Sequence, residues 1–309
     1  MSDLPSTVRI CEEGPREGFQ SEPPGIVAAA KIELIDALAE TGLGDIACCS
    51  FVSPKYVPQM ADAEEVAAGL RKRAGVRYTG LWLNASGFAR ARATPLDLTG
   101  LVVASASETF GIKNNNRNRA EMLAGQQSLM SDYRDAAIDA FAAYVFTAFG
   151  CNYEGEIAPT LVIGAIEDLL SVIPDPEVVY LCDTIGSASP PTIERVIAEV
   201  RSHWPELPLG LHLHDTRGVG MANALTGLQL GVARFDTSIG GLGGCPFAGN
   251  RPAAGNLCTE DLAYLCAELG IETGLDIPAL IEAARLAEHI VGHPLPGKLK
   301  QAGLPARLL

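Results

Sequence analysis

The sequence has no surplus of positive charge. Its 23 lysines and arginines are outnumbered by 37 aspartates and glutamates, which gives 309 residues a formal net charge of -14. A field of this sign repels phosphate backbones and anionic headgroups, so we expect neither nucleic acid nor a membrane surface as a partner. Any anionic substrate must therefore bind in a local basic pocket. No apolar run reaches the roughly 18 residues needed to cross a bilayer, so no membrane span is expected.

Two other common patterns are also missing. The eight cysteines show no C-x-x-C spacing, and several lie in apolar runs that are typical of buried strands. No signal peptide precedes them, so we expect reduced thiols and a cytoplasmic location. The glycine-rich phosphate turn that follows the first strand of a doubly wound sheet is absent as well, which disfavours that fold.

Short β-rich runs instead alternate with helical patterns along the whole chain. Strands are expected at residues 8–13, 45–51, 77–83, 101–107, 143–149, 178–184, 209–215 and 234–240. Helices are expected at residues 27–41, 63–74, 87–94, 119–140, 159–172, 190–203, 219–231 and 260–269. Eight βα units predict an α/β fold of the TIM (β/α)8 barrel type. We expect one catalytic domain over residues 1–309, with residues 271–309 packing on the barrel as a C-terminal extension that includes a helix at 278–291.

The seventh expected strand carries the most informative motif, GLHLHDTRG at residues 210–218. Side chains in a strand repeat every second residue, so His212 and His214 point to the same side. Two imidazoles on one face provide half of a metal site. The alternative is a pair of satisfied polar residues at a strand end, because a two-ligand motif is weak evidence.

Chemistry in TIM barrels lies at the C-terminal ends of the strands and in the loops that follow them. Arg16 and Glu17 follow the first expected strand. The Glu17 carboxylate would complete a mixed nitrogen and oxygen metal site, unless it is an ordinary solvated loop residue. The Arg16 guanidinium suits a planar anion, unless it forms a structural ion pair with Glu12 or Asp183.

Three further candidates follow the sixth and eighth strands. Asp183 ends an apolar run, where a carboxylate is costly unless it is paired or catalytic. Cys245 lies among glycines 240, 241, 243 and 244, which indicate a lid or a close backbone approach. A lid cysteine serves as an acid or base when its pKa falls, whereas a lone cysteine is otherwise a small buried hydrophobe. The Asn256 side-chain carbonyl suits a hard cation.

These segments resemble the 3-hydroxy-3-methylglutaryl-CoA lyase family and, more broadly, the DRE-TIM metallolyases. The resemblance is carried by GPREGFQ at 14–20 against the family's GPRDGLQ, SFVSPKYVPQM at 50–60, DTIG at 183–186, HLHDT at 212–216 and GLGGCPFA at 241–248. It covers nearly the whole chain. The SFVSPK and GLGGCP runs are specific to the lyase branch of these barrels.

The resemblance implies an enzyme, a metal-dependent lyase that cleaves a 3-hydroxyacyl-CoA by a retro-Claisen reaction to acetyl-CoA and a keto acid. It implies a divalent cation, with Mg²⁺ or Mn²⁺ favoured and Zn²⁺ or Co²⁺ as alternatives. The implied metal ligands are Glu17, His212, His214 and Asn256. Arg16 is implied to stabilise the enolate, Cys245 to be the lid acid or base, and Asp183 to lie near the substrate hydroxyl.

The resemblance also assigns substrate binding to Gln20, Ser50 and Thr184. The expected ligand is an acyl-CoA, and the expected assembly is a homodimer.

Three departures from the family pattern bear on the substrate. Glu17 stands where the family has a ligand aspartate, and its extra methylene adds about 1.5 Å of reach. The family glutamate after the second strand is Ala47. The loop from Cys245 to Asn256 is two residues longer than usual, so Asn250 or Arg251 could face an anionic substrate.

These departures favour an altered acyl group over lost chemistry. Two other readings remain. A Claisen-condensing synthase or an aldolase could use the same barrel, although the GLGGCP run speaks against both. A non-catalytic homologue that binds an acyl-CoA or metabolite is suggested by Glu17 and Ala47.

Overall fold

The structure is a computed structural model that describes residues 4–139, 141–243 and 255–308. Its elements fall into two compact units. The central unit consists chiefly of residues 98–233, and the terminal unit chiefly of residues 5–97, 234–244 and 252–309. Each unit contributes four parallel strands to the fold.

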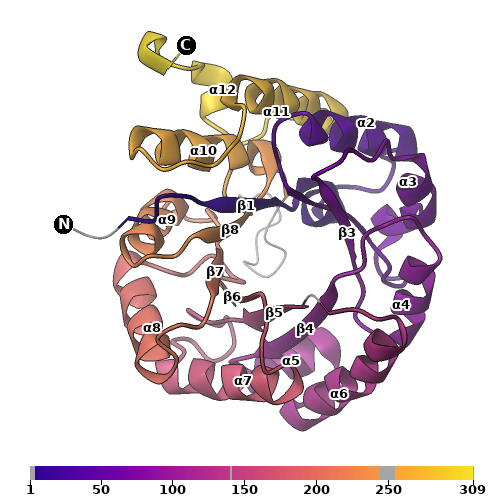
Figure 1. The fold of residues 1–309 in the computed structure, drawn as a ribbon, viewed down its shortest axis with the longest axis vertical. Helices are drawn as coiled ribbons and strands as arrows, with labels where there is room; N and C mark the ends of the chain where they lie inside the picture. Colours follow the sequence, from indigo (N-terminus) through magenta and orange to yellow (C-terminus); the bar gives the residue numbers. More distant parts are fainter. Residues whose placement is uncertain (1–3, 140, 244–254, 309) are drawn as a thin grey trace. The chain divides into compact units, whose positions relative to one another are not determined.

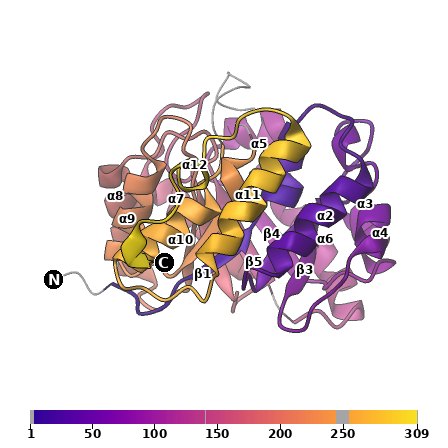
Figure 2. The ribbon, with the colours of Figure 1, turned by 90° about the horizontal axis from the view of Figure 1, so that it is seen from above.

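The terminal unit contains strands in the order β3-β2-β1-β8. They are β1 (Arg9–Glu12), β2 (Asp45–Ser50), β3 (Arg77–Leu81) and β8 (Arg234–Thr237). Its helices are α1 (Phe19–Ser21), α2 (Ala28–Ala39), α3 (Ala63–Gly69), α4 (Ala85–Arg92), α10 (Thr259–Glu268), α11 (Ile277–Val291) and α12 (Leu299–Ala302), with 3-10 turns η2 (Pro58–Met60), η3 (Ile239–Gly241) and η5 (Ala306–Leu308). Helix α11 lies beside α2 and contacts it, as Figure 2 shows.

The central unit contains strands in the order β7-β6-β5-β4. They are β4 (Gly100–Ser105), β5 (Phe141–Phe146), β6 (Val178–Cys182) and β7 (Leu209–His212). Its helices are α5 (Glu108–Asn115), α6 (Arg119–Asp135), α7 (Pro159–Val172), α8 (Pro190–His203) and α9 (Gly220–Gln229). Helices α6 to α9 line one side of these four strands (Figure 1).

Local sequence explains where these elements begin. Asn118 and Glu121 form a capping box that starts α6, and prolines occupy the first turns of α7 and α8, where a missing N–H has no cost. Every residue of β2 and β6 is buried, as expected for parallel strands covered on both faces.

The predicted succession of eight βα units is confirmed, and the fold belongs to the TIM (β/α)8 class. The helix expected at 278–291 is α11. The strands end one to three residues earlier than the β-rich runs predict, and α5 and the turn at Gly14–Gly18 were not predicted. Among the described residues, no helix is both long and apolar enough to cross a membrane.

Candidate active site

The two histidines meet at the end of β7 in the central unit. His212 is the last residue of the strand, and His214 follows it in an isolated bridge position, so the predicted alternation continues past the strand end. Both side chains are buried, and their Nε2 atoms lie 3.3 Å apart. The expectation that the two imidazoles share one face is therefore confirmed.

Asp183 follows β6 in the same unit and is buried. Its Oδ1 accepts the N–H groups of Ser187 (2.8 Å) and Ala188 (3.0 Å), whereas Oδ2 has no hydrogen-bond partner within the described chain. Burial raises the pKa of Asp183 above its ordinary value, and the nearby His214 offsets part of that rise. The carboxyl thus has one oxygen fixed by the backbone and one oxygen available.

Thr184, beside Asp183, is held by a residue that the sequence did not single out. Its hydroxyl accepts the N–H of Thr147 at 2.8 Å. Thr147 directly follows β5 and has φ 55°, a left-handed conformation that is an outlier for a β-branched residue. Backbone strain of this kind concentrates at functional sites, where the surrounding contacts enforce it. No sequence pattern signals a positive φ at a threonine.

In the terminal unit, a single π-helical turn, η1 (Gly14–Gly18), follows β1 and carries Arg16 and Glu17. The N–H groups of Arg16 and Glu17 both donate to the carbonyl of Glu13, at 3.1 and 2.7 Å. A Cβ on Gly14 would lie 2.6 Å from Glu12 Oε1, so this position accepts only glycine without a shift. π-helical turns are rare in proteins, and those that do occur are often found at functional sites.

Two carboxylates hold the Arg16 guanidinium. Its Nε donates to Glu13 Oε2 at 2.7 Å, Nη2 pairs with the same oxygen, and Nη1 lies 2.9 Å from Glu17 Oε2. The alternative ion pair with Glu12 is therefore wrong. Glu12 and Glu13 point to opposite faces of β1, and only Glu13 faces Arg16. Glu17 is not a solvated loop residue, because its side chain is 22% exposed and ion-paired.

Glu12 instead joins the ends of β1 and β8. Its Oε1 accepts the N–H groups of Gly14 (2.7 Å) and Ile239 (2.9 Å), and its Oε2 lies 2.5 Å from the Thr259 hydroxyl. Burial raises the pKa of Glu12 to about 7, although these three hydrogen bonds lower it. This side chain therefore fixes the start of the turn that carries Arg16.

The terminal unit also contains three other predicted site residues. Ser50, at the end of β2, is fully buried, and its hydroxyl donates to Gln20 Oε1 at 3.2 Å. Asn256 is buried, and its Oδ1 has no hydrogen-bond partner among the residues described. Gly240 and Gly241 form a buried turn with φ 65° and 68° rather than an open segment. Cys245, Asn250 and Arg251 lie outside the described residues.

The donor atoms in each unit fit a divalent cation. Two nitrogens bound at about 2.1 Å and at right angles lie about 3 Å apart, close to the separation of the His212 and His214 nitrogens. The partnerless buried Oδ1 of Asn256 is the kind of acceptor that a hard cation satisfies. The Glu17 carboxylate adds a charged oxygen. Imidazole nitrogens, carboxylate oxygens and amide oxygens are each ligand types found for Mg²⁺, Mn²⁺, Co²⁺ or Zn²⁺.

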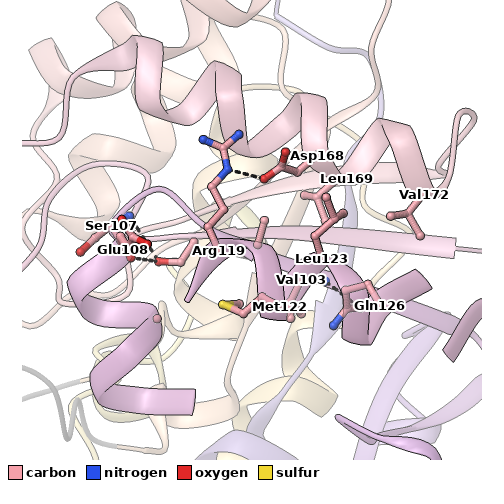
Figure 3. A pocket seen from close by; sticks show the side chains of 13 residues that line it. Val103, Ser107, Glu108, Arg119, Met122, Leu123, Gln126, Asp168, Leu169 and Val172 are labelled. Atoms are coloured by element: carbon pink, nitrogen blue, oxygen red, sulfur yellow. Dashed lines mark hydrogen bonds and ion pairs between the residues drawn. The ribbon is translucent and has the colours of Figure 1, made fainter. Parts of the chain in front are cut away.

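A small cavity lies in the central unit between β4, α6 and α7 (Figure 3). It measures about 20 Å³, which holds about one water molecule. The ion pair of Arg119 and Asp168, at 2.5 Å, lies on its lining. The cavity is too small for an acyl-CoA and is a packing seam.

Comparisons with known proteins show the family of the chain. Residues 7–287 match the HMGL-like family. The chain is 39% identical to the mitochondrial hydroxymethylglutaryl-CoA lyase of Rattus norvegicus over 98% of this chain and 91% of that protein. It is similar to the HMG-CoA lyase structure from Bacillus subtilis, with a TM-score of 0.91, 38% identity, and 97% and 98% of the two chains covered.

A second similar structure is an HMG-CoA lyase from Acinetobacter baumannii in complex with coenzyme A and 3-methylmalate. It has a TM-score of 0.87 and 37% identity, and the match covers 100% of this chain and 99% of that one. The resemblance seen in the sequence motifs thus extends over nearly the whole length of several lyases. The chain belongs to the HMGL-like family, whose members among these relatives are hydroxymethylglutaryl-CoA lyases.

Proposed function

We propose that this protein cleaves 3-hydroxy-3-methylglutaryl-CoA, or a 3-hydroxyacyl-CoA close to it, to acetyl-CoA and a keto acid. With the named substrate the keto acid is acetoacetate. The observation that carries the proposal is the buried imidazole pair of His212 and His214, with facing nitrogens 3.3 Å apart, in a chain of this family. Such a pair suits a metal-assisted reaction on a substrate with adjacent oxygen atoms.

We propose that Glu17, His212, His214 and Asn256 hold the divalent cation, with Mg²⁺ or Mn²⁺ favoured and Zn²⁺ or Co²⁺ as alternatives. When bound, the cation supplies positive charge that polarises the substrate's 3-hydroxyl group and acidifies it. The ligand set requires neutral imidazoles and an ionised Glu17, so protons compete with the metal and acidification weakens its binding.

The reaction converts the 3-hydroxyl to a ketone. A base removes the hydroxyl proton, the C2–C3 bond breaks, and its electron pair moves onto the thioester as an enolate. Protonation of the enolate carbon then gives acetyl-CoA. Asp183, with its free Oδ2, is assigned to the neighbourhood of the hydroxyl, and Cys245 is assigned to deliver the proton to the enolate.

Arg16 is assigned to the charge that appears during the reaction. Its guanidinium is permanently charged and already fixed at two edges, so it needs no reorganisation as the enolate oxygen becomes negative. Gln20, Ser50 and Thr184 are assigned to contacts with the substrate. Their hydroxyl and amide groups are already tied to neighbouring groups, which favours a preformed pocket.

The remaining features of the proposal concern the whole molecule. We propose an acyl-CoA ligand, a homodimer, a cytoplasmic location, and one catalytic domain over residues 1–309 with residues 271–309 as its extension. Sedimentation of the purified protein tests the dimer, and fractionation of the source cells tests the location.

The decisive experiment measures acetyl-CoA release from a panel of 3-hydroxyacyl-CoA thioesters. We expect turnover of 3-hydroxy-3-methylglutaryl-CoA or a close relative, loss of turnover with EDTA, and recovery when Mg²⁺ or Mn²⁺ is added back. The exposed His203, on α8, provides a matched control, because His203→Ala removes an imidazole outside the proposed site. Binding of acyl-CoA without carbon–carbon cleavage of any substrate in the panel would favour the non-catalytic alternative.

A further inference from the structure

Glu13 is the partner that holds one edge of the Arg16 guanidinium. Glu13 directly follows β1, its side chain is only 4% exposed, and its Oε2 contacts both Nε and Nη2 of Arg16. One carboxylate oxygen therefore fixes a complete edge of the guanidinium. Because Glu17 contacts the opposite nitrogen, Nη1, the plane of Arg16 is determined from two sides.

The surroundings of Glu13 favour this ion pair. The other carboxylate oxygen, Oε1, lies 4.0 Å from Cys11 Sγ, and the ligand atoms of Cys11, Glu13 and Asp236 lie within 4.8 Å of one another. Burial and the adjacent carboxylates raise the pKa of Cys11, so the thiol stays neutral and adds no charge. A buried carboxylate in acidic surroundings is tolerated when a cation pairs with it, and Arg16 provides that cation.

Strand register identifies the neighbour of Glu13. Cys11 pairs with Asp45 and Glu12 with Ile46 in the parallel β1–β2 ladder. Continuing this register by one residue places Glu13 beside Ala47, on the same face of the sheet. Ala47 is buried and presents only a methyl group. Of these two neighbouring positions, only Glu13 offers Arg16 a carboxylate.

We propose that Glu13 is a positioning residue for the reaction, which orients the Arg16 guanidinium toward the developing enolate. The proposal rests on the proposed lyase function. It predicts that loss of Glu13 affects the chemical step more than substrate binding. It also predicts that a carboxylate at position 47 can orient Arg16 in place of the one at position 13, since these two positions lie side by side on adjacent strands.

The first test uses Glu13→Gln, which keeps the shape of the side chain and removes its charge. We expect kcat to fall by about ten- to a hundredfold, the loss that a displacement of about 1 Å produces, while KM for the acyl-CoA changes less than about threefold. A folded variant with wild-type kcat would overturn the proposal. If Glu13→Gln fails to fold, Glu13→Asp keeps the charge, shortens the arm, and gives the same expected loss.

The second test separates positioning from a structural role. Glu13→Val should show the same loss of kcat as Glu13→Gln. Adding Ala47→Glu to the Glu13→Val variant should raise kcat at least tenfold above that of the single variant. A merely structural Glu13 would not be replaced by a carboxylate on β2, so failure of this rescue in a folded double variant would contradict the proposal.

The third test does not depend on activity. Phenylglyoxal reacts with accessible guanidinium groups, and peptide mass spectrometry reports the modification of each arginine. We expect Arg16 to react faster in Glu13→Gln than in the wild type, while Arg71, 84% exposed, reacts equally in both and provides an internal control. Unchanged Arg16 reactivity would refute the positioning role. If the wild type releases acetyl-CoA from no 3-hydroxyacyl-CoA but Arg16 reactivity changes as expected, the lyase assignment fails and the ion pair of Glu13 and Arg16 is still supported.

Discussion

Glu12 offers a quantitative test of how the turn after β1 is held. The carboxyl is fully buried, and its two oxygens accept hydrogen bonds from Gly14, Ile239 and Thr259. A protonated carboxyl or an amide satisfies the same three groups, because the Thr259 hydroxyl can accept as well as donate and its second neighbour is the Thr237 hydroxyl at 2.7 Å. Glu12→Gln therefore mimics the protonated state at every pH.

Burial raises the pKa of Glu12 from 4.5 to about 7 in the folded protein. A raised folded pKa stabilises the native state fully below the unfolded value, and this stabilisation is lost as the pH rises through about 7. A difference of about 2.5 pKa units corresponds to about 3.4 kcal/mol, of which about 2.5 kcal/mol is lost between pH 5 and pH 8. The glutamine variant does not titrate and should not show this loss.

The assay is urea unfolding at pH 5 and pH 8, followed by the fluorescence of the buried Trp82. We expect Glu12→Gln to gain about 2.5 kcal/mol of unfolding free energy relative to the wild type on going from pH 5 to pH 8. The pKa of Glu260, raised by burial to about 8, affects both proteins and largely cancels in this difference. Glu65→Gln, on the exposed side of α3, controls for removal of one carboxylate. Identical pH dependence in the wild type and Glu12→Gln would refute the reasoning.

Three further predictions address the proposed metal and lid. His212→Ala should abolish binding of Mn²⁺, measured by calorimetry, because it removes one of the four proposed ligands and breaks the imidazole pair. His203→Ala should bind the ion normally. Full affinity in His212→Ala would remove the histidines from the site. Glu17→Asp should bind the metal at least as tightly as the wild type and gain turnover on 3-hydroxy-3-methylglutaryl-CoA, if the longer side chain only adapts to a shifted ion; weaker binding would show that the glutamate is required. Cys245→Ser should lower turnover by about 10²- to 10⁴-fold with substrate affinity unchanged, as for a lost general acid, and wild-type turnover would move the proton donor elsewhere.

The fold was largely predictable because its signals are local and repeated. Helices α7 and α8 begin at prolines and carry apolar residues at helical spacing, and their observed bounds match the predicted 159–172 and 190–203. Strand ends were predicted less well. The β-rich run at 178–184 continues beyond β6, where the chain turns into the loop that holds Asp183 and Thr184. The residue types of a β-rich run do not indicate at which residue the hydrogen bonds to the neighbouring strand end.

The site was only partly predictable for a related reason. A two-residue period places His212 and His214 on one face, and this holds even though β7 ends at His212. The same period separates Glu12 from Glu13, but it does not reveal which of them faces Arg16. That depends on which face of β1 meets the turn that follows. The positive φ of Thr147 is likewise set by surrounding hydrogen bonds rather than by the residue's own preference.

The two glutamates at the end of β1 explain how this chain tolerates alanine at position 47. Successive side chains along a strand point to opposite faces of the sheet, so the adjacent Glu12 and Glu13 make two separate sets of contacts. Glu12 ties the turn after β1 to the segment after β8 through backbone N–H groups, and Glu13 binds the side chain of the same turn. The first interaction fixes where the backbone of Arg16 lies, and the second fixes the orientation of its guanidinium. A carboxylate on β2 is not needed for either purpose, so its absence is compatible with an Arg16 that is fully oriented.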